Sequence, residues 1–168
     1  MKVLYLLRHA KAGFDLTGMA DADRVLTHTG KQDAIKLGYK LKGRNAEIDR
    51  FYCSPALRTR QTLELLLEAA GNGEERTEVV PAIYQAGEQT VLGIIHQVPH
   101  YYDAVMLIGH NPAMTQLSNL LSRDFRLDHL PTCGLVVIHF NLTHWADIEA
   151  QSGEVSWFDF PKTDYSIL

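Results

Sequence analysis

The stretch Lys2–Lys11, KVLYLLRHAK, is the part of the chain from which the rest can be interpreted. Val3–Leu7 is an apolar run interrupted only by Tyr5, and its length is that of a buried β-strand. Arg8 and His9 follow directly at its end. An arginine has little reason to follow a buried strand unless it meets an anion there. The pair predicts an anion site with His9 as nucleophile and Arg8 as anion holder. The alternative is a surface ion pair for Arg8 and a core position for His9.

The composition is that of a globular protein, which we expect to form one domain over residues 1–168. Hydrophobic residues make up 46% of the chain and charged residues 21%, a balance that argues against disorder. The formal net charge of −4 argues against a nucleic-acid-binding protein driven by bulk electrostatics. Any anion must therefore be recognised by a few placed cations.

No run of about 18 apolar residues marks a membrane span, and the N-terminus enters a strand without a signal-peptide layout. We therefore expect a cytoplasmic protein with neither a membrane nor a nucleic acid as partner. In that compartment Cys53 and Cys133 are expected to be reduced, buried thiols rather than a disulfide.

Strand and helix patterns alternate along the chain. Apolar runs bounded by turn residues predict strands over Val3–Leu7, Ile48–Cys53, Glu78–Val80, Ala104–Ile108 and Leu135–Phe140. Helices are expected after a capping box of Thr29 with Gln32, from Ser54-Pro55, over Glu88–Val98, and from Pro112 with Asn111 as cap. The alternation predicts an α/β domain of three layers, with a mostly parallel central sheet and helices on both faces.

The last part of the chain predicts a different unit. Trp145–Ala150 and Val155–Phe160 are expected to form a C-terminal hairpin across Ser152-Gly153.

Three of the expected strands end in polar side chains. His9 follows the first strand, Ser54 the second, and His110 the strand Ala104–Ile108. Ligands of parallel α/β sheets bind outside the carboxyl ends of strands, so we expect these side chains at one rim. As an imidazolium, His110 would bind an oxygen of the anion. The alternative is a turn histidine bonded to the backbone.

The helix that follows Ser54 supplies a second arginine. Arg58 shares a helix face with Gln61 and Thr62, whereas Arg60 lies on another face. We therefore place Arg58 in the site and give Arg60 a solvated or packing role. Two planar guanidinium groups around an imidazole nucleophile suit phosphoryl transfer, because the transferred group carries charge on three oxygens.

Four segments, RHAK, LTHTG, CSPALRTRQT and GHNP, make the sequence resemble the histidine phosphatase superfamily, which has the phosphoglycerate-mutase-like fold. They are most similar to its short bacterial phosphohistidine phosphatase branch. The resemblance implies that His9 attacks phosphorus and becomes phosphohistidine, and that water hydrolyses this intermediate. It further implies a phosphate pocket made of Arg8, Arg58 and His110, with no metal and no organic cofactor.

The proton donor does not follow from the resemblance, because this short chain lacks the insertions in which the mutase and acid phosphatase branches place theirs. Asp21, in the loop Ala12–Thr27 after the nucleophile, is our candidate, and Glu88 is the competitor. An imidazole leaving group, with a pKa of about 6.5, needs little help to depart. The lack of an obvious donor therefore favours phosphohistidine on a protein as substrate.

Other functions stay open on the sequence. The same chemistry on a small phosphorylated metabolite, such as a sugar phosphate, is the first alternative, and a non-catalytic phosphoprotein-binding module is the second. A metal site is not expected, because Pro99 interrupts the helical spacing of His96 and His100 and the chain has no HExxH motif. We expect a monomer or a weak homo-oligomer.

Overall fold

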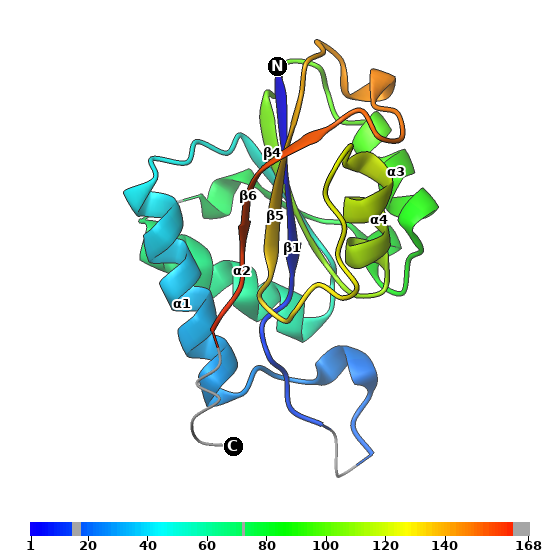
Figure 1. Ribbon diagram of the computed structural model, residues 1–168. Coiled ribbons are helices and arrows are strands. Elements are labelled where there is room, and N and C mark those ends of the chain that lie inside the picture. The colour runs from blue at the N-terminus through cyan, green and yellow to red at the C-terminus, as the bar shows by residue number, and fades with distance from the viewer. Residues whose placement is uncertain (15–17, 72, 163–168) are drawn as a thin grey trace.

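β1, Lys2–Arg8, lies inside a six-stranded sheet in the computed structural model of the protein, which describes residues 1–14, 18–71 and 73–162 (Figure 1). The strand order is β3-β2-β4-β1-β5-β6. β1, β4, β2 and β3 run parallel, β5 is antiparallel to β1, and β6 is antiparallel to β5. The sheet is mostly parallel, as predicted, and the predicted domain's last residues, 163–168, lie outside the described part of the chain.

The remaining elements have the following bounds: α1 His28–Gly43, β2 Arg50–Cys53, α2 Leu57–Ala70, β3 Thr77–Val79, α3 Glu88–His96, β4 Ala104–Gly109, α4 Ala113–Leu121, β5 Leu135–Phe140 and β6 Glu154–Asp159. None of the helices among the described residues is long and apolar enough to cross a membrane.

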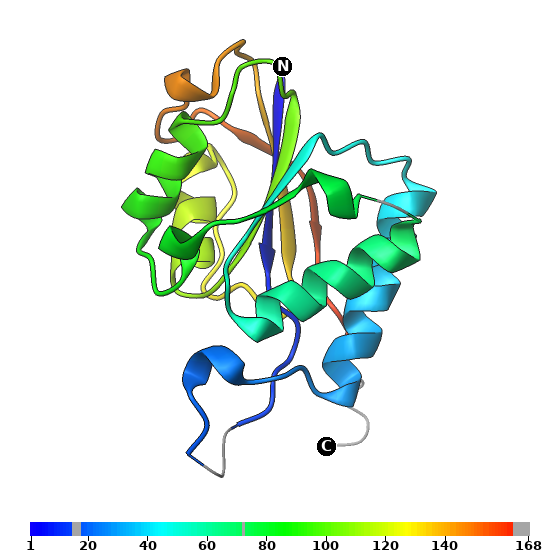
Figure 2. The ribbon, with the colours of Figure 1, turned by 180° about the vertical axis from the view of Figure 1, so that it is seen from behind.

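The central strands alternate their side chains between two hydrophobic cores, one on each face of the sheet. Leu4 and Leu6 of β1 pack in the core that α3 and α4 cover, whereas Leu7 packs in the core that α1 and α2 cover. Figures 1 and 2 show these two helix pairs on opposite faces. The three-layer α/β fold is thus confirmed.

A close approach between α1 and α2 fixes the helix that carries Arg58. A Cβ atom at Gly38 of α1 would lie 2.3 Å from the carbonyl oxygen of Leu66 in α2. A side chain at position 38 would therefore push α2 away from α1.

The first residues of two helices differ from the predictions. α1 begins at His28, and Oγ1 of Thr27 accepts a hydrogen bond from the backbone N–H of Gly30, so Thr27 rather than Thr29 caps it. α2 begins at Leu57, so Ser54 precedes the helix and does not cap it. This leaves the Ser54 hydroxyl available to other partners.

α4 begins one residue later than predicted, at Ala113, so Pro112 and not the predicted Asn111 is its N-cap residue, although Asn111 still bonds the first turn of the helix. Its Oδ1 accepts hydrogen bonds from the backbone N–H and the hydroxyl of Thr115.

The predicted C-terminal hairpin is wrong in its first strand. β6 pairs with β5 instead, and Trp145–Asp147 forms a 3-10 helix. The Trp145 ring is completely buried in the core beneath α3, and its indole N–H donates to the carbonyl of Tyr102 (2.7 Å). The large apolar side chains of Trp145–Ala150 therefore pack beneath a helix and do not belong to a strand.

Candidate active site

The predicted site residues gather at the end of the sheet where the parallel strands finish. Arg8 is the last residue of β1 and His9 follows it, Arg58 lies in the first turn of α2, and His110 follows β4. This is the lower end of the sheet in Figure 1, where α2 begins and the loop into β5 passes. The rings of His9 and His110 have centroids 5.4 Å apart, and Arg58 reaches His110 as well.

His9 is held on both sides by neighbouring strand ends. Its backbone N–H donates to Gly109 O (3.1 Å), and its carbonyl accepts from the N–H of Cys133 (2.9 Å). Its Nδ1 lies 2.7 Å from the carbonyl oxygen of Ala10. Because a carbonyl only accepts, Nδ1 carries the ring proton and Nε2 keeps its lone pair.

The same histidine is neutral at pH 7. Burial lowers the pKa of His9 to about 3, with smaller contributions in the same direction from His110, Arg58 and Arg8. A neutral imidazole with an unprotonated Nε2 is chemically competent as a nucleophile.

Arg58 is buried, with 6% of its surface exposed, and binds the loop after β1. Nη1 donates to the carbonyl oxygen of Asp21 (2.9 Å), and Nη2 donates to Asp21 Oδ2 (3.1 Å). Nη2 also lies 3.3 Å from Nδ1 of His110. The guanidinium thus links that loop to the strand end that carries His110.

Two buried donors in the site lack an acceptor. Within the described residues, neither Nε of Arg8 nor Nε of Arg58 has a hydrogen-bond partner. Leaving a buried N–H without an acceptor costs about 1–3 kcal/mol. Burial, and after it the charge of Arg58, lowers the pKa of Arg8. An anion between the two arginines would relieve both penalties.

His110 differs in charge from the expectation. Its Nδ1 accepts from Arg58, so its ring proton lies on Nε2, which donates to Oγ of Ser54 (2.7 Å). Burial, followed by the charge of Arg58, lowers the pKa of His110 to about 4. In this arrangement it is a neutral hydrogen-bonding group rather than the predicted imidazolium, and Ser54 orients it.

Asp21 lies beside the site, as a carboxylate. Oδ2 accepts from the hydroxyl of Tyr84 (2.6 Å) and from Arg58, and Oδ1 accepts from Arg24 (3.0 Å). The Tyr84 hydrogen bond, followed by the arginines, lowers the pKa of Asp21 to about 2. The carboxyl group is therefore ionised above about pH 3 and holds no proton to donate, which weakens its assignment as general acid.

Replacing Asp21 with asparagine should change binding more than chemistry. The variant removes an anion that competes for Arg58, so the inhibition constant of inorganic phosphate should fall, by about fivefold at most because the ion pair is partly exposed. The kcat should stay within about threefold. Asp23→Asn, an exposed neighbour, is the matched control. A kcat loss of about 100-fold in the Asp21 variant alone would restore Asp21 as proton donor.

Glu88, the competing donor, is the first residue of α3 and half-buried. Among the described residues, no hydrogen bond or ion pair joins it to Arg8, His9, Arg58 or His110. The structure therefore does not bring it into the cluster.

Two side chains of the site are not marked by any sequence motif. Tyr84, for which packing is the simpler expectation, points its hydroxyl at Asp21, and its ring makes a T-shaped contact with the ring of His110, with centroids 5.6 Å apart. His129 accepts a hydrogen bond from Nη1 of Arg8 (3.0 Å). Neither lies within 60 residues of its charged partner in the sequence, so local patterns carry no signal for these contacts.

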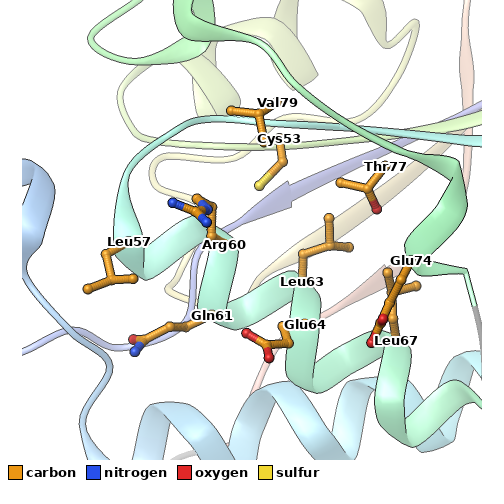
Figure 3. A pocket seen from close by; sticks show the side chains of 10 residues that line it. All are labelled: Cys53, Leu57, Arg60, Gln61, Leu63, Glu64, Leu67, Glu74, Thr77 and Val79. Atoms are coloured by element: carbon orange, nitrogen blue, oxygen red, sulfur yellow. The ribbon is translucent and has the colours of Figure 1, made fainter.

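Arg60 lies outside this cluster, as predicted from its helix face. It lines a separate cavity of about 280 Å³ between α2 and β3, together with Cys53, Leu57, Gln61 and Val79 among others (Figure 3). The two arginines of α2 thus lie in different places: Arg58 belongs to the candidate site, and Arg60 lines this cavity.

Within residues 1–14, 18–71 and 73–162, no group of three or more His, Cys, Asp or Glu side chains is arranged to hold a metal ion. Cys53 and Cys133 are both free and buried, and burial raises the pKa of each thiol to about 12.

Comparison with known proteins assigns the family. The model of the histidine phosphatase superfamily (branch 1) matches residues 4–84, the segment that contains Arg8, His9 and Arg58. The chain belongs to the histidine phosphatase superfamily. An uncharacterized protein of Mycobacterium tuberculosis is 30% identical over 166 residues, covering 93% of this chain and 100% of the relative.

Two further members of this superfamily carry a functional name. Phosphohistidine phosphatase SixA of Escherichia coli is 29% identical over 116 residues, covering 68% of this chain and 70% of its own. The solved structure of a protein assigned as phosphohistidine phosphatase SixA from Nakamurella multipartitia has a TM-score of 0.82 at 29% identity, covering 96% of this chain and 97% of that one. The predicted family is confirmed, and the chain is a phosphatase of this superfamily.

Proposed function

We propose that this phosphatase removes the phosphoryl group from phosphohistidine on a protein through a covalent intermediate on His9. The observation that carries the proposal is the state of His9: a buried, neutral imidazole whose Nε2 is unprotonated. Arg8 and Arg58 flank it, each with a buried Nε that lacks an acceptor. This arrangement suits a nucleophile that attacks a group with several anionic oxygens.

The reaction has two displacements. In the first, the Nε2 lone pair of His9 forms a bond to phosphorus while the P–N bond to the substrate imidazole breaks. The electron pair of that bond stays on the substrate nitrogen, which takes a proton from water. In the second, water attacks phosphorus and gives its proton to the hydroxide left by the first displacement, the electron pair of the new P–N bond returns to Nε2, and inorganic phosphate leaves.

Arg8 and Arg58 have the role of stabilising charge on the phosphoryl oxygens in both displacements. His110 presents Nδ1 on the side opposite Ser54, and this nitrogen can donate to a phosphoryl oxygen once it takes up a proton, which a nearby phosphate dianion favours by raising the pKa of the ring. Arg58 must exchange Asp21 for the phosphoryl oxygens, because its two terminal nitrogens are bound to that residue.

The electrostatics of the site support a P–N over a P–O substrate. An alkoxide leaving group needs a strong proton donor, whereas imidazole, with a pKa of about 6.5, departs with little assistance. The carboxyl group bonded to Arg58, that of Asp21, has its pKa lowered to about 2 and is ionised. The name of the Escherichia coli relative, a phosphohistidine phosphatase, supports the same substrate class.

A comparison of substrates tests the proposal. The kcat/KM for a phosphotransfer domain carrying phosphohistidine should exceed that for glucose 6-phosphate and ribose 5-phosphate by at least about 100-fold, since a proton donor contributes on the order of that factor to ester cleavage. Faster turnover of either sugar phosphate would contradict it. Tight binding of the phosphoprotein without any release of phosphate would instead identify a binding module.

A further inference from the structure

We propose that His129 is a positioning residue for Arg8. By accepting a hydrogen bond from Nη1, it fixes the guanidinium so that Nε and Nη2 stay available to the phosphoryl group. The inference rests on the phosphate-binding role proposed above for Arg8 and extends it to a loop residue that no motif marks.

The contacts of Arg8 are one-sided. Nη1 donates both to Nε2 of His129 and to the carbonyl oxygen of Leu130, each at 3.0 Å. Nε is buried and has no partner, and no hydrogen bond from Nη2 is formed with any described residue. A guanidinium binds a phosphoryl group best through two neighbouring N–H groups, and these two remain free.

The protonation of His129 follows from its partner. An arginine nitrogen only donates, so Nε2 of His129 accepts and the ring proton lies on Nδ1. Nδ1 lies 3.5 Å from the amide nitrogen of Asn111, which is also a donor, so that contact adds little. The hydrogen bond to Arg8 is therefore the ring's one well-formed contact within the described part of the chain.

The segment that carries His129 and Leu130, between α4 and β5, also connects the ends of two strands. The carbonyl of Leu130 accepts from Arg8 and from the side-chain amide of Asn111 (2.9 Å). Arg8 precedes His9 and Asn111 follows His110, so this segment sets the spacing of both imidazoles from one side. Because His129 itself is exposed, its hydrogen bond contributes more to the orientation of Arg8 than to folding stability.

Two substitutions of His129 distinguish an effect on the orientation of Arg8 from an effect on folding stability. His129→Leu removes the acceptor, whereas His129→Gln places an amide oxygen near the position of Nε2. With phosphoramidate, a small P–N substrate that lacks the protein part of phosphohistidine, His129→Leu should lower kcat about tenfold and change KM less than threefold. His129→Gln should recover most of that loss. His144→Leu, which removes an exposed histidine remote from the cluster, should change neither constant, and the melting temperature of all three should match the wild type.

A double-mutant cycle shows whether His129 acts through Arg8. If it does, adding His129→Leu to Arg8→Ala should cause no further loss of kcat. An additive tenfold loss in that background, or no loss in His129→Leu alone while Arg8→Ala is impaired, would overturn the inference. A loss seen only with a phosphohistidine protein would also overturn it, by making His129 a contact for the protein. Full activity of Arg8→Ala would instead refute the phosphate-binding role on which the inference rests.

Discussion

Replacement of His9 by alanine should lower turnover of phosphohistidine by a factor on the order of 10³ or more, because removal of a nucleophile leaves only the contribution of binding groups. The physical reason is that Nε2 of His9 is the one unprotonated ring nitrogen in the pair His9 and His110 that is free of a hydrogen bond. The wild-type enzyme is mixed with a phosphohistidine protein that carries a radiolabelled phosphoryl group, and the reaction is stopped with alkali. Label should remain on the enzyme, since P–N bonds survive base and not acid.

The companion variants define the control. His9→Ala should retain no label, whereas His110→Ala should retain label even if it forms more slowly. His9→Ala should still bind the phosphoprotein, because Arg8 and Arg58 remain. Label on His9→Ala would place the covalent intermediate on another residue and refute the assignment.

Replacement of Arg58 by alanine should lower kcat/KM about 10³-fold, the scale at which an arginine stabilises a phosphoryl transition state. Arg58→Lys should recover only part of this loss, because an ammonium group keeps the charge but not the planar pair of donors. Steady-state kinetics with phosphohistidine protein and with phosphoramidate should give the same ratio, since the effect lies at the phosphoryl group common to both.

Arg60→Ala is a closely matched control, two residues further along the same helix. Arg60 is exposed and lines the separate cavity between α2 and β3, so its loss should change kcat/KM less than twofold. Equal losses in the two alanine variants would mean that the helix as a whole, and not the Arg58 guanidinium, supports activity.

The fold and much of the cluster were predictable from the sequence because local patterns carry them. Alternation of short apolar runs with helical periodicity determines the layers, and polar residues after strands must reach the same edge of a parallel sheet. The choice of Arg58 over Arg60 needed only helical spacing. The roles of His9, Arg8, Arg58 and His110 stay predictions until the variants above are measured.

The features that were not predictable depend on contacts between distant segments. The lowered pKa of Asp21 comes first from the hydrogen bond of Tyr84, 63 residues away, and Arg8 meets His129 across 121 residues. The neutral state of His110 comes from burial, which a turn motif does not reveal. Trp145 was misassigned to a strand because an apolar side chain anchored beneath a helix and one in a sheet look alike over a few residues.

The position of β1 has a consequence for how this enzyme can diversify. The strand that delivers His9 has a neighbour on each side, and the backbone of His9 is bonded to both flanking segments. The proposed nucleophile is therefore part of the rigid frame, while Asp21, Tyr84 and His129 come from connecting segments. New substrates can be recruited by exchanging those connections and leaving the frame intact, which makes residues 18–27, 80–87 and 122–134 the rational targets for redesign.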